Sequence, residues 1–143
     1  MDLTNLYVAD ETAWLDLQAS LIRSGRSAEL DLENLEEFLE SMANRDRRAV
    51  ERRLALLIEH VLKWEHQPAR RGPSWRRTIL VQQHDLRQYL RSGSLRRHAE
   101  DVLPAASLRG VSQAAAATGL APGTFPTHCP WTLDELLAYT PAP

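Results

Sequence analysis

Apolar side chains along this sequence recur at intervals of three and four residues, and no stretch alternates apolar and polar residues as strands do. A period near 3.6 residues places such side chains on one face of a helix. The pattern therefore predicts an all-α fold without a sheet, a compact bundle of four to six helices with short connections. At 143 residues the chain is long enough for one hydrophobic core. We expect a single domain over residues 1–143, with a loose leader (1–9) and a loose tail (140–143).

Capping and helix-breaking residues divide this pattern into segments. Asp10 is suited to cap a first helix that Gly25 ends. Residues 32–66 begin with an apolar stripe of Leu32, Leu35, Leu39 and Met42, and they are either one long helix or two helices with a kink near Asn44. We favour two, because "ANRDRR" interrupts the apolar pattern there. The further helices expected are Trp75 to about Leu90 with Ser74 as N-cap, Leu95 to about Thr118 with Ser94 as N-cap and a kink or restart at Pro104, and Leu133 to about Tyr139 behind a capping box of Thr132 and Glu135. The alanine-rich end of the helix over 95–118 suits close helix packing, and Gly119 should end it.

Charge is unevenly distributed along the chain. The net charge is −2, so no overall field attracts nucleic acid or an anionic membrane. Residues 63–98, however, carry nine basic and two acidic side chains, whereas residues 1–62 carry seven basic and thirteen acidic ones. Sixteen of the seventeen basic residues are arginine. A GC-rich genome is the favoured explanation, and the alternative is that planar guanidinium groups bind carboxylate or phosphate.

Several functional classes have no support in the sequence. The single cysteine, Cys129, excludes an internal disulfide and a cysteine-based zinc site. No Gly-rich phosphate loop and no protease or hydrolase motif is present. His128 precedes Cys129 directly, and adjacent residues rarely reach the geometry of a nucleophile and its base. No stretch is typical of a signal peptide or a membrane span. We expect a cytoplasmic protein with no catalytic residues, no cofactor and no membrane partner.

The stretch "LKWEHQPARRGPSW", residues 62–75, contains two tryptophans, two prolines and two adjacent arginines between two helical patterns. Two interpretations remain open. In one, the turn is a structural clamp in which tryptophans pack the connection and Gln67 or an arginine binds the carbonyl groups at the helix end. In the other, it is a pocket with aromatic walls and polar groups for a partner. Our first functional hypothesis is a protein-interaction module, or a homo-oligomer, that binds through the following residues: Trp64, Gln67, Arg70, Arg71, Trp75 and Arg76.

Two alternatives come from other classes. Four arginines, Arg70, Arg71, Arg76 and Arg77, could grip a nucleic-acid backbone while the tryptophans stack on bases. We favour instead that these arginines pair with the acidic first third of this chain or of a sister subunit.

The other alternative is a metal-dependent enzyme. Glu33 and Glu37 are four positions apart and so share a helix face, and His60 is the best candidate for a further ligand. The favoured explanation of these residues is a solvated glutamate face and a core histidine.

Three segments carry a family resemblance. They are "LDLENLEEFLESM", "LLIEHVLKWEHQPARRGPSWRRTI" and "ATGLAPGTFPTHCPWTLDELL", in that order along nearly the whole chain. They resemble the bacterial domain-of-unknown-function family numbered twenty-nine. Most of the specificity lies in Lys63-Trp64, Gln67-Pro68, Arg71, Ser74-Trp75 and Cys129-Pro130-Trp131. The resemblance implies a compact all-α protein of the bacterial cytoplasm, and it implies no activity.

Overall fold

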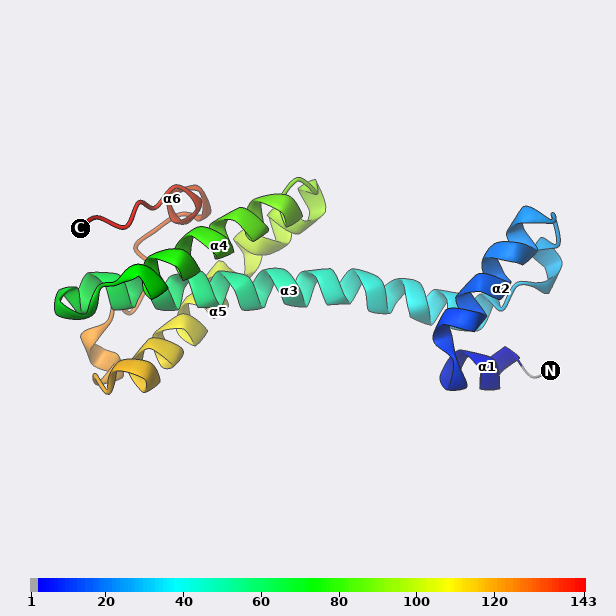
Figure 1. Ribbon diagram of the computed structural model, residues 1–143, viewed down its shortest axis with the longest axis horizontal. Coiled ribbons are helices and arrows are strands. Elements are labelled where there is room, and N and C mark those ends of the chain that lie inside the picture. The colour runs from blue at the N-terminus through cyan, green and yellow to red at the C-terminus, as the bar shows by residue number, and fades with distance from the viewer. Residues whose placement is uncertain (1–2) are drawn as a thin grey trace. The chain divides into compact units, whose positions relative to one another are not determined.

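The computed structural model describes residues 3–143, and within that range the chain forms helices and no strand (Figure 1). This confirms the all-α fold class. The six α-helices are α1 (Leu3–Ala9), α2 (Glu11–Arg23), α3 (Leu32–His66), α4 (Pro73–Tyr89), α5 (Gly93–Thr118) and α6 (Leu133–Leu137). Three short 3-10 helices lie between them: η1 (Ser27–Glu29), η2 (Pro68–Arg70) and η3 (Pro122–Thr124).

The chain divides into two compact units, residues 1–44 and residues 45–143, and α3 contributes to both. The expectation of a single domain stays a prediction. Most of the expected leader forms α1, and its first two residues lie outside the described range.

The first unit is built around Trp14, whose side chain is completely buried. Its indole Nε1 donates a hydrogen bond to Asp31 at 2.9 Å. Its ring lies 4.6 Å from that of Tyr7 and 6.0 Å from that of Phe38, measured between centroids. Asp10 caps α2 as predicted, because its carboxylate accepts from the backbone of Ala13 at 3.1 Å. One buried indole therefore joins α1, α2 and the start of α3.

Residues 32–66 form a single helix, so the favoured division near Asn44 is wrong. The segment "ANRDRR" interrupts the apolar stripe, but it contains no glycine or proline. Alanine and arginine are strong helix formers, and the backbone hydrogen bonds of a helix do not depend on which face is apolar. A loss of amphipathic pattern without a helix-breaking residue therefore changes what the helix contacts, and it does not end the helix.

The second unit packs α4, α5 and α6 around the last part of α3, where Leu54, Leu57 and Val61 are fully buried. Helix α5 approaches α3 closely at Gly110, and its small residues Ala106 and Ala114 are also buried. It continues through Pro104, so the expected restart is absent. The close approach depends on small side chains, as the alanine-rich sequence suggested.

Side chains of α4 link it to α3 and α6. Arg53 of α3 donates to Gln82 at 3.2 Å and to Asp85 at 2.9 Å. Gln83 donates its amide to the carbonyl oxygens of Leu136 at 3.0 Å and Tyr139 at 2.8 Å. Arg87 donates to the carbonyl of Leu137. A helix as short as α6 leaves most of its C-terminal carbonyls unpaired, and here α4 supplies donors for three backbone carbonyls at that end.

Two of the expected helix starts are displaced. The N-cap of α4 is Gly72, and Pro73 is the first helical residue, so the expectation that Ser74 caps this helix is wrong. Proline is favoured at that position because its missing N–H has no helical partner there. Likewise Ser92, rather than Ser94, caps α5 by accepting from the backbone of Leu95. Two other local predictions are confirmed: the capping box at the start of α6, and the left-handed glycine that ends α5.

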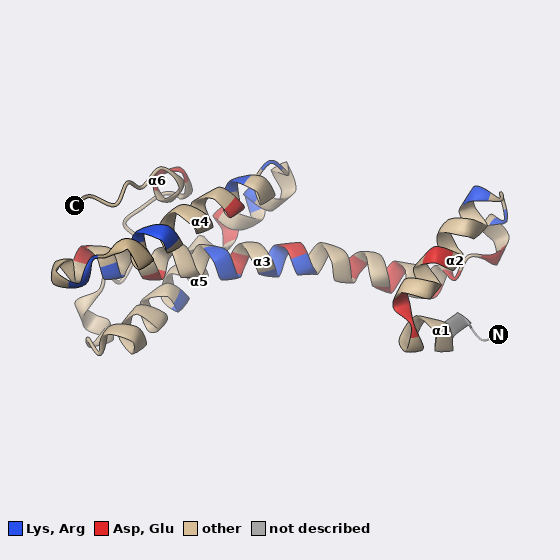
Figure 2. Ribbon diagram, in the orientation of Figure 1, with Lys and Arg blue, Asp and Glu red and all other residues tan. Residues whose placement is uncertain are grey.

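The two units differ strongly in charge (Figure 2). Residues 1–44 contain ten acidic and two basic side chains, and residues 45–143 contain nine acidic and fifteen basic ones. The first unit is therefore strongly acidic and the second is basic.

Candidate functional site

The turn after α3 is fixed by an arginine that binds the helix end. Proline at position 68 cannot continue the helix, and residues 68–70 form η2. Arg71, which follows η2, donates from Nε to the carbonyl oxygen of Trp64 at 2.7 Å. That carbonyl belongs to the last turn of α3, where backbone acceptors lack helical partners. The structure therefore contains the arginine contact that the clamp interpretation predicted.

Trp64 is a buried anchor rather than an exposed side chain, with only 2% of its surface accessible. Its indole Nε1 donates to the carbonyl oxygen of Ala142 at 2.9 Å. The last residues of the chain thus cross the end of α3, and Pro141 among them is buried. These four residues, expected to be loose, form no helix, but their backbone accepts hydrogen bonds from Trp64 and Arg71.

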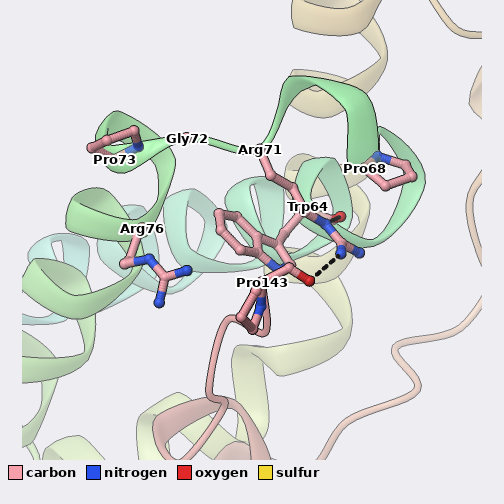
Figure 3. Close-up of a pocket in the computed structure, with 7 residues that line it drawn as sticks. All are labelled: Trp64, Pro68, Arg71, Gly72, Pro73, Arg76 and Pro143. Carbon is pink, nitrogen blue, oxygen red and sulfur yellow. Dashed lines mark hydrogen bonds between the residues drawn. The ribbon is translucent and has the colours of Figure 1, made fainter.

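Two guanidinium groups lie against the Trp64 ring. The Cζ atom of Arg71 is 5.3 Å from the ring centroid, and that of Arg76 is 5.2 Å from it. Both distances are within cation–π range. A hollow of about 510 Å³ opens beside them, shown in Figure 3. We call it the arginine–tryptophan pocket; it is lined by Trp64, Pro68, Arg71, Gly72, Pro73, Arg76 and Pro143.

Acidic side chains of the second unit do not neutralise the positive charge of this pocket. Within residues 45–143, neither Arg71 nor Arg76 forms an ion pair with an aspartate or glutamate side chain. Arg71 donates to main-chain oxygens, of Trp64 and, at 3.4 Å, of Pro143. Arg76 has only the ring contact, so the N–H groups of its half-buried guanidinium are free to donate. Such groups bind carboxylates more strongly than fully solvated ones, because the surroundings screen less.

The other binding candidates from the sequence lie outside the pocket lining. Trp75 is half-buried, with the Lys63 ammonium 4.8 Å from its ring centroid. Arg70 and Arg77 are exposed. The Oε1 atom of Gln67 is buried without a hydrogen-bond partner among the described residues. The structure therefore brings together three of the six candidates, Trp64, Arg71 and Arg76.

The metal hypothesis gains no support from the structure. Among residues 3–143, no group of three or more His, Cys, Asp or Glu side chains converges to hold a metal ion. Glu33 and Glu37 lie in the first unit and His60 lies in the second. Their role as metal ligands stays a prediction.

His60 is a mostly buried histidine bonded to its own helix, as the simpler explanation predicted. Its Nδ1 lies 3.0 Å from the carbonyl oxygen of Leu56, so Nδ1 carries the proton. Burial lowers the pKa of His60 below its ordinary value of 6.5, and the positive charge of Lys63 lowers it further. The Leu56 hydrogen bond and the nearby Glu59 carboxylate raise it, but burial dominates. His60 therefore gains its proton at a lower pH in the folded protein than in the unfolded chain.

This lowered pKa predicts a pH dependence of stability. As pH falls below about 6.5, the unfolded chain binds a proton at position 60 before the folded one does. The free energy of unfolding should therefore decrease from pH 7 to pH 5. The free energy of unfolding of His60→Gln, measured by urea denaturation, should decrease less over that range. Equal pH dependence of this variant and the unchanged protein would contradict this assignment.

Sequence reasoning missed two parts of the pocket. Pro68 and Pro73 were seen only as turn residues, although their rings line the hollow. Pro143 lies 79 positions after Trp64, and no local pattern links the two. The only signal was the composition of "TPAP", whose prolines favour an extended chain without helix.

Comparisons with known proteins place the chain in a family but give it no activity. The family described as "Domain of unknown function DUF29" matches residues 6–140. No curated protein and no solved structure matches the chain. Across the described residues, none of the helices combines the length and apolar character needed to cross a membrane.

Proposed function

Because the chain belongs to the DUF29 family of unassigned function, we propose from its geometry that it is a protein-interaction module, and that its arginine–tryptophan pocket binds an acidic segment of a partner protein. One observation carries this proposal: two half-buried guanidinium groups line an open hollow without an aspartate or glutamate partner from their own unit. A bacterial cytoplasmic location is part of the same proposal.

The chemistry of the pocket fits a carboxylate-bearing peptide. A guanidinium presents paired N–H donors that match the two oxygens of a carboxylate. Clusters of arginine are a recurrent means of recognising acidic motifs. The indole edge and the three proline rings offer apolar contacts beside the charges. The volume of about 510 Å³ lies within the ~300–1,000 Å³ that is usual for binding pockets.

A nucleic-acid partner fits the same site less well. The sequence hypothesis required the tryptophans to stack on bases, as in proteins that bind single strands. Trp64 is buried beneath the chain terminus and two guanidiniums, and Lys63 covers Trp75. Trp64 therefore offers no open face, and Lys63 occupies one face of Trp75.

The proposal is tested with synthetic peptides of about eight residues that carry several glutamates around one apolar residue. Binding is measured by fluorescence anisotropy, with the same peptides bearing glutamine in place of glutamate as negative controls. Acidic peptides should bind, and added salt should lower their affinity for the protein.

Arg76→Gln should weaken this binding about ten-fold or more, because it removes one charged donor of the pocket without removing a structural hydrogen bond. Arg70→Gln, the matched control, should bind as the unchanged protein does, since Arg70 is exposed and outside the lining. Equal affinity of the two variants, or binding of oligonucleotides but not of peptides, would refute the proposal.

A further inference from the structure

The outward face of α3 in the first unit is apolar and uncovered. Leu32 and Leu39 leave 69% and 63% of their surface exposed. They are seven positions apart and so lie on one side of the helix. The opposite side faces Trp14 through Phe38, and the nearby Asn34 is buried. The core of the first unit is thus complete without the two leucines.

Acidic side chains frame this face. Glu33, Glu36 and Glu40 are exposed, and no basic side chain of residues 3–44 pairs with them. That unit has only two arginines, of which Arg26 already pairs with Glu29. Two such acidic faces would repel one another. The occupant of this face must therefore be apolar and basic.

Helix α4 of the same polypeptide carries a surface of that chemistry. Leu80 and Val81 leave 50% and 41% of their surface exposed. Arg77 precedes Leu80 by three positions and Val81 by four. His84 follows Leu80 by four positions and Val81 by three. All four side chains therefore share one side of the helix. Arg77 forms no ion pair within residues 45–143. This basic face lies outside the lining of the arginine–tryptophan pocket.

We propose that the chain forms a two-fold dimer in which the Leu32–Leu39 face of α3 in each copy packs against the Arg77–His84 face of α4 in the other. Because every copy carries both faces, two-fold symmetry makes the contact twice. The leucines of one copy bury against Leu80 and Val81 of the other, and the surrounding glutamates lie near Arg77. Apolar burial supplies the driving force, and opposite charges fix the orientation.

Sedimentation velocity of the full chain over a wide range of micromolar concentrations tests this dimer. A monomer–dimer equilibrium that weakens at high salt is expected, since exposed charges are screened. Leu39→Glu and Arg77→Glu should each raise the dissociation constant about ten-fold or more. Leu108→Glu and Arg97→Glu, which alter exposed residues of α5 outside both faces, should leave it unchanged. Circular dichroism verifies that all four variants are folded.

Mixing the two defective variants separates this arrangement from other dimers. Leu39→Glu keeps the basic face and Arg77→Glu keeps the acidic one, so a mixed dimer has one intact contact and one contact that carries both substitutions. Because one added glutamate is expected to abolish the contact that it enters, the mixed dimer keeps one contact and each variant alone keeps none. The mixture should therefore associate more tightly than either variant alone. A protein that stays monomeric at every concentration would overturn the proposal. That outcome includes a monomer in which the two faces contact each other within a single chain. A dimer that is insensitive to Arg77→Glu, or a mixture no tighter than its components, would also overturn the proposal.

Discussion

Replacing Trp64 with alanine is expected to lower the free energy of unfolding by about 3–5 kcal/mol, the usual cost of removing a large buried aromatic side chain. The indole is 2% exposed, and it supports both the chain terminus and two arginines. Alanine would leave a cavity beneath Arg71 and would remove the donor to the carbonyl of Ala142. Urea denaturation measures the loss.

A conservative variant separates packing from hydrogen bonding at the same position. Trp64→Phe keeps most of the apolar volume and removes only the Nε1 donor, so it should cost much less, on the order of 1–2 kcal/mol. If Trp64→Ala lowered the free energy of unfolding no more than Trp64→Phe does, Trp64 would not be the anchor that we describe.

Replacing Gly110 with alanine is expected to destabilise the fold by about 1–2 kcal/mol. An added Cβ atom would lie 2.7 Å from Cγ2 of Ile58 and 3.1 Å from the backbone oxygen of Ala55. Overpacking of this kind costs about 1–3 kcal/mol. Alanine gains up to about 1 kcal/mol over glycine within a helix, and this gain only partly offsets the clash.

Gly93 provides the matched control on the same helix. A Cβ atom added there would meet no heavy atom within 4 Å. Gly93→Ala should therefore change stability by no more than about 0.5 kcal/mol. Thermal and urea denaturation of both variants give the comparison, and equal effects would show that α5 does not depend on a close approach to α3 at position 110.

Local sequence signals predicted local structure well. The aspartate that caps α2, the capping box of α6 and the glycine that ends α5 act within four residues, and each was predicted from its neighbours alone. The errors at the starts of α4 and α5 are also local. Two serines, Ser92 and Ser94, stand close to the start of α5, and in α4 the proline at the first position favours a start before Ser74.

It was harder to predict that α3 is a single helix and that it contributes to two compact units. An interruption of the apolar pattern was interpreted as the end of a helix, whereas it marks the passage from one compact unit to the next. The stripe of Leu32 and Leu39 was identified, but periodicity gives the side that is apolar and not the neighbour that covers it. Exposure of these leucines follows from Trp14, which fills the core on the other side.

The candidate site could be predicted only in part. Composition identified the tryptophans and arginines around the turn. Which arginines reach the Trp64 ring depends on how α4 leaves the turn, because Arg71 and Arg76 reach it while Arg70 and Arg77 do not line the pocket. The contact with Ala142 joins residues 78 positions apart, and only the folded chain brings them together.

The indole N–H signal of Trp64 in a two-dimensional ¹H–¹⁵N NMR spectrum tests the central claim most directly, since that group lies at the pocket and donates to Ala142. On titration with an acidic peptide, this signal and the side-chain Nε signal of Arg76 should move and saturate together. The glutamine-substituted peptide should move neither, and Arg76→Gln should require about ten-fold or more peptide for the same change at Trp64, while Arg70→Gln requires no more than the unchanged protein. An acidic peptide that leaves both signals in place, or that shifts Trp64 equally in the Arg76→Gln variant, would contradict an acidic-segment site at this pocket.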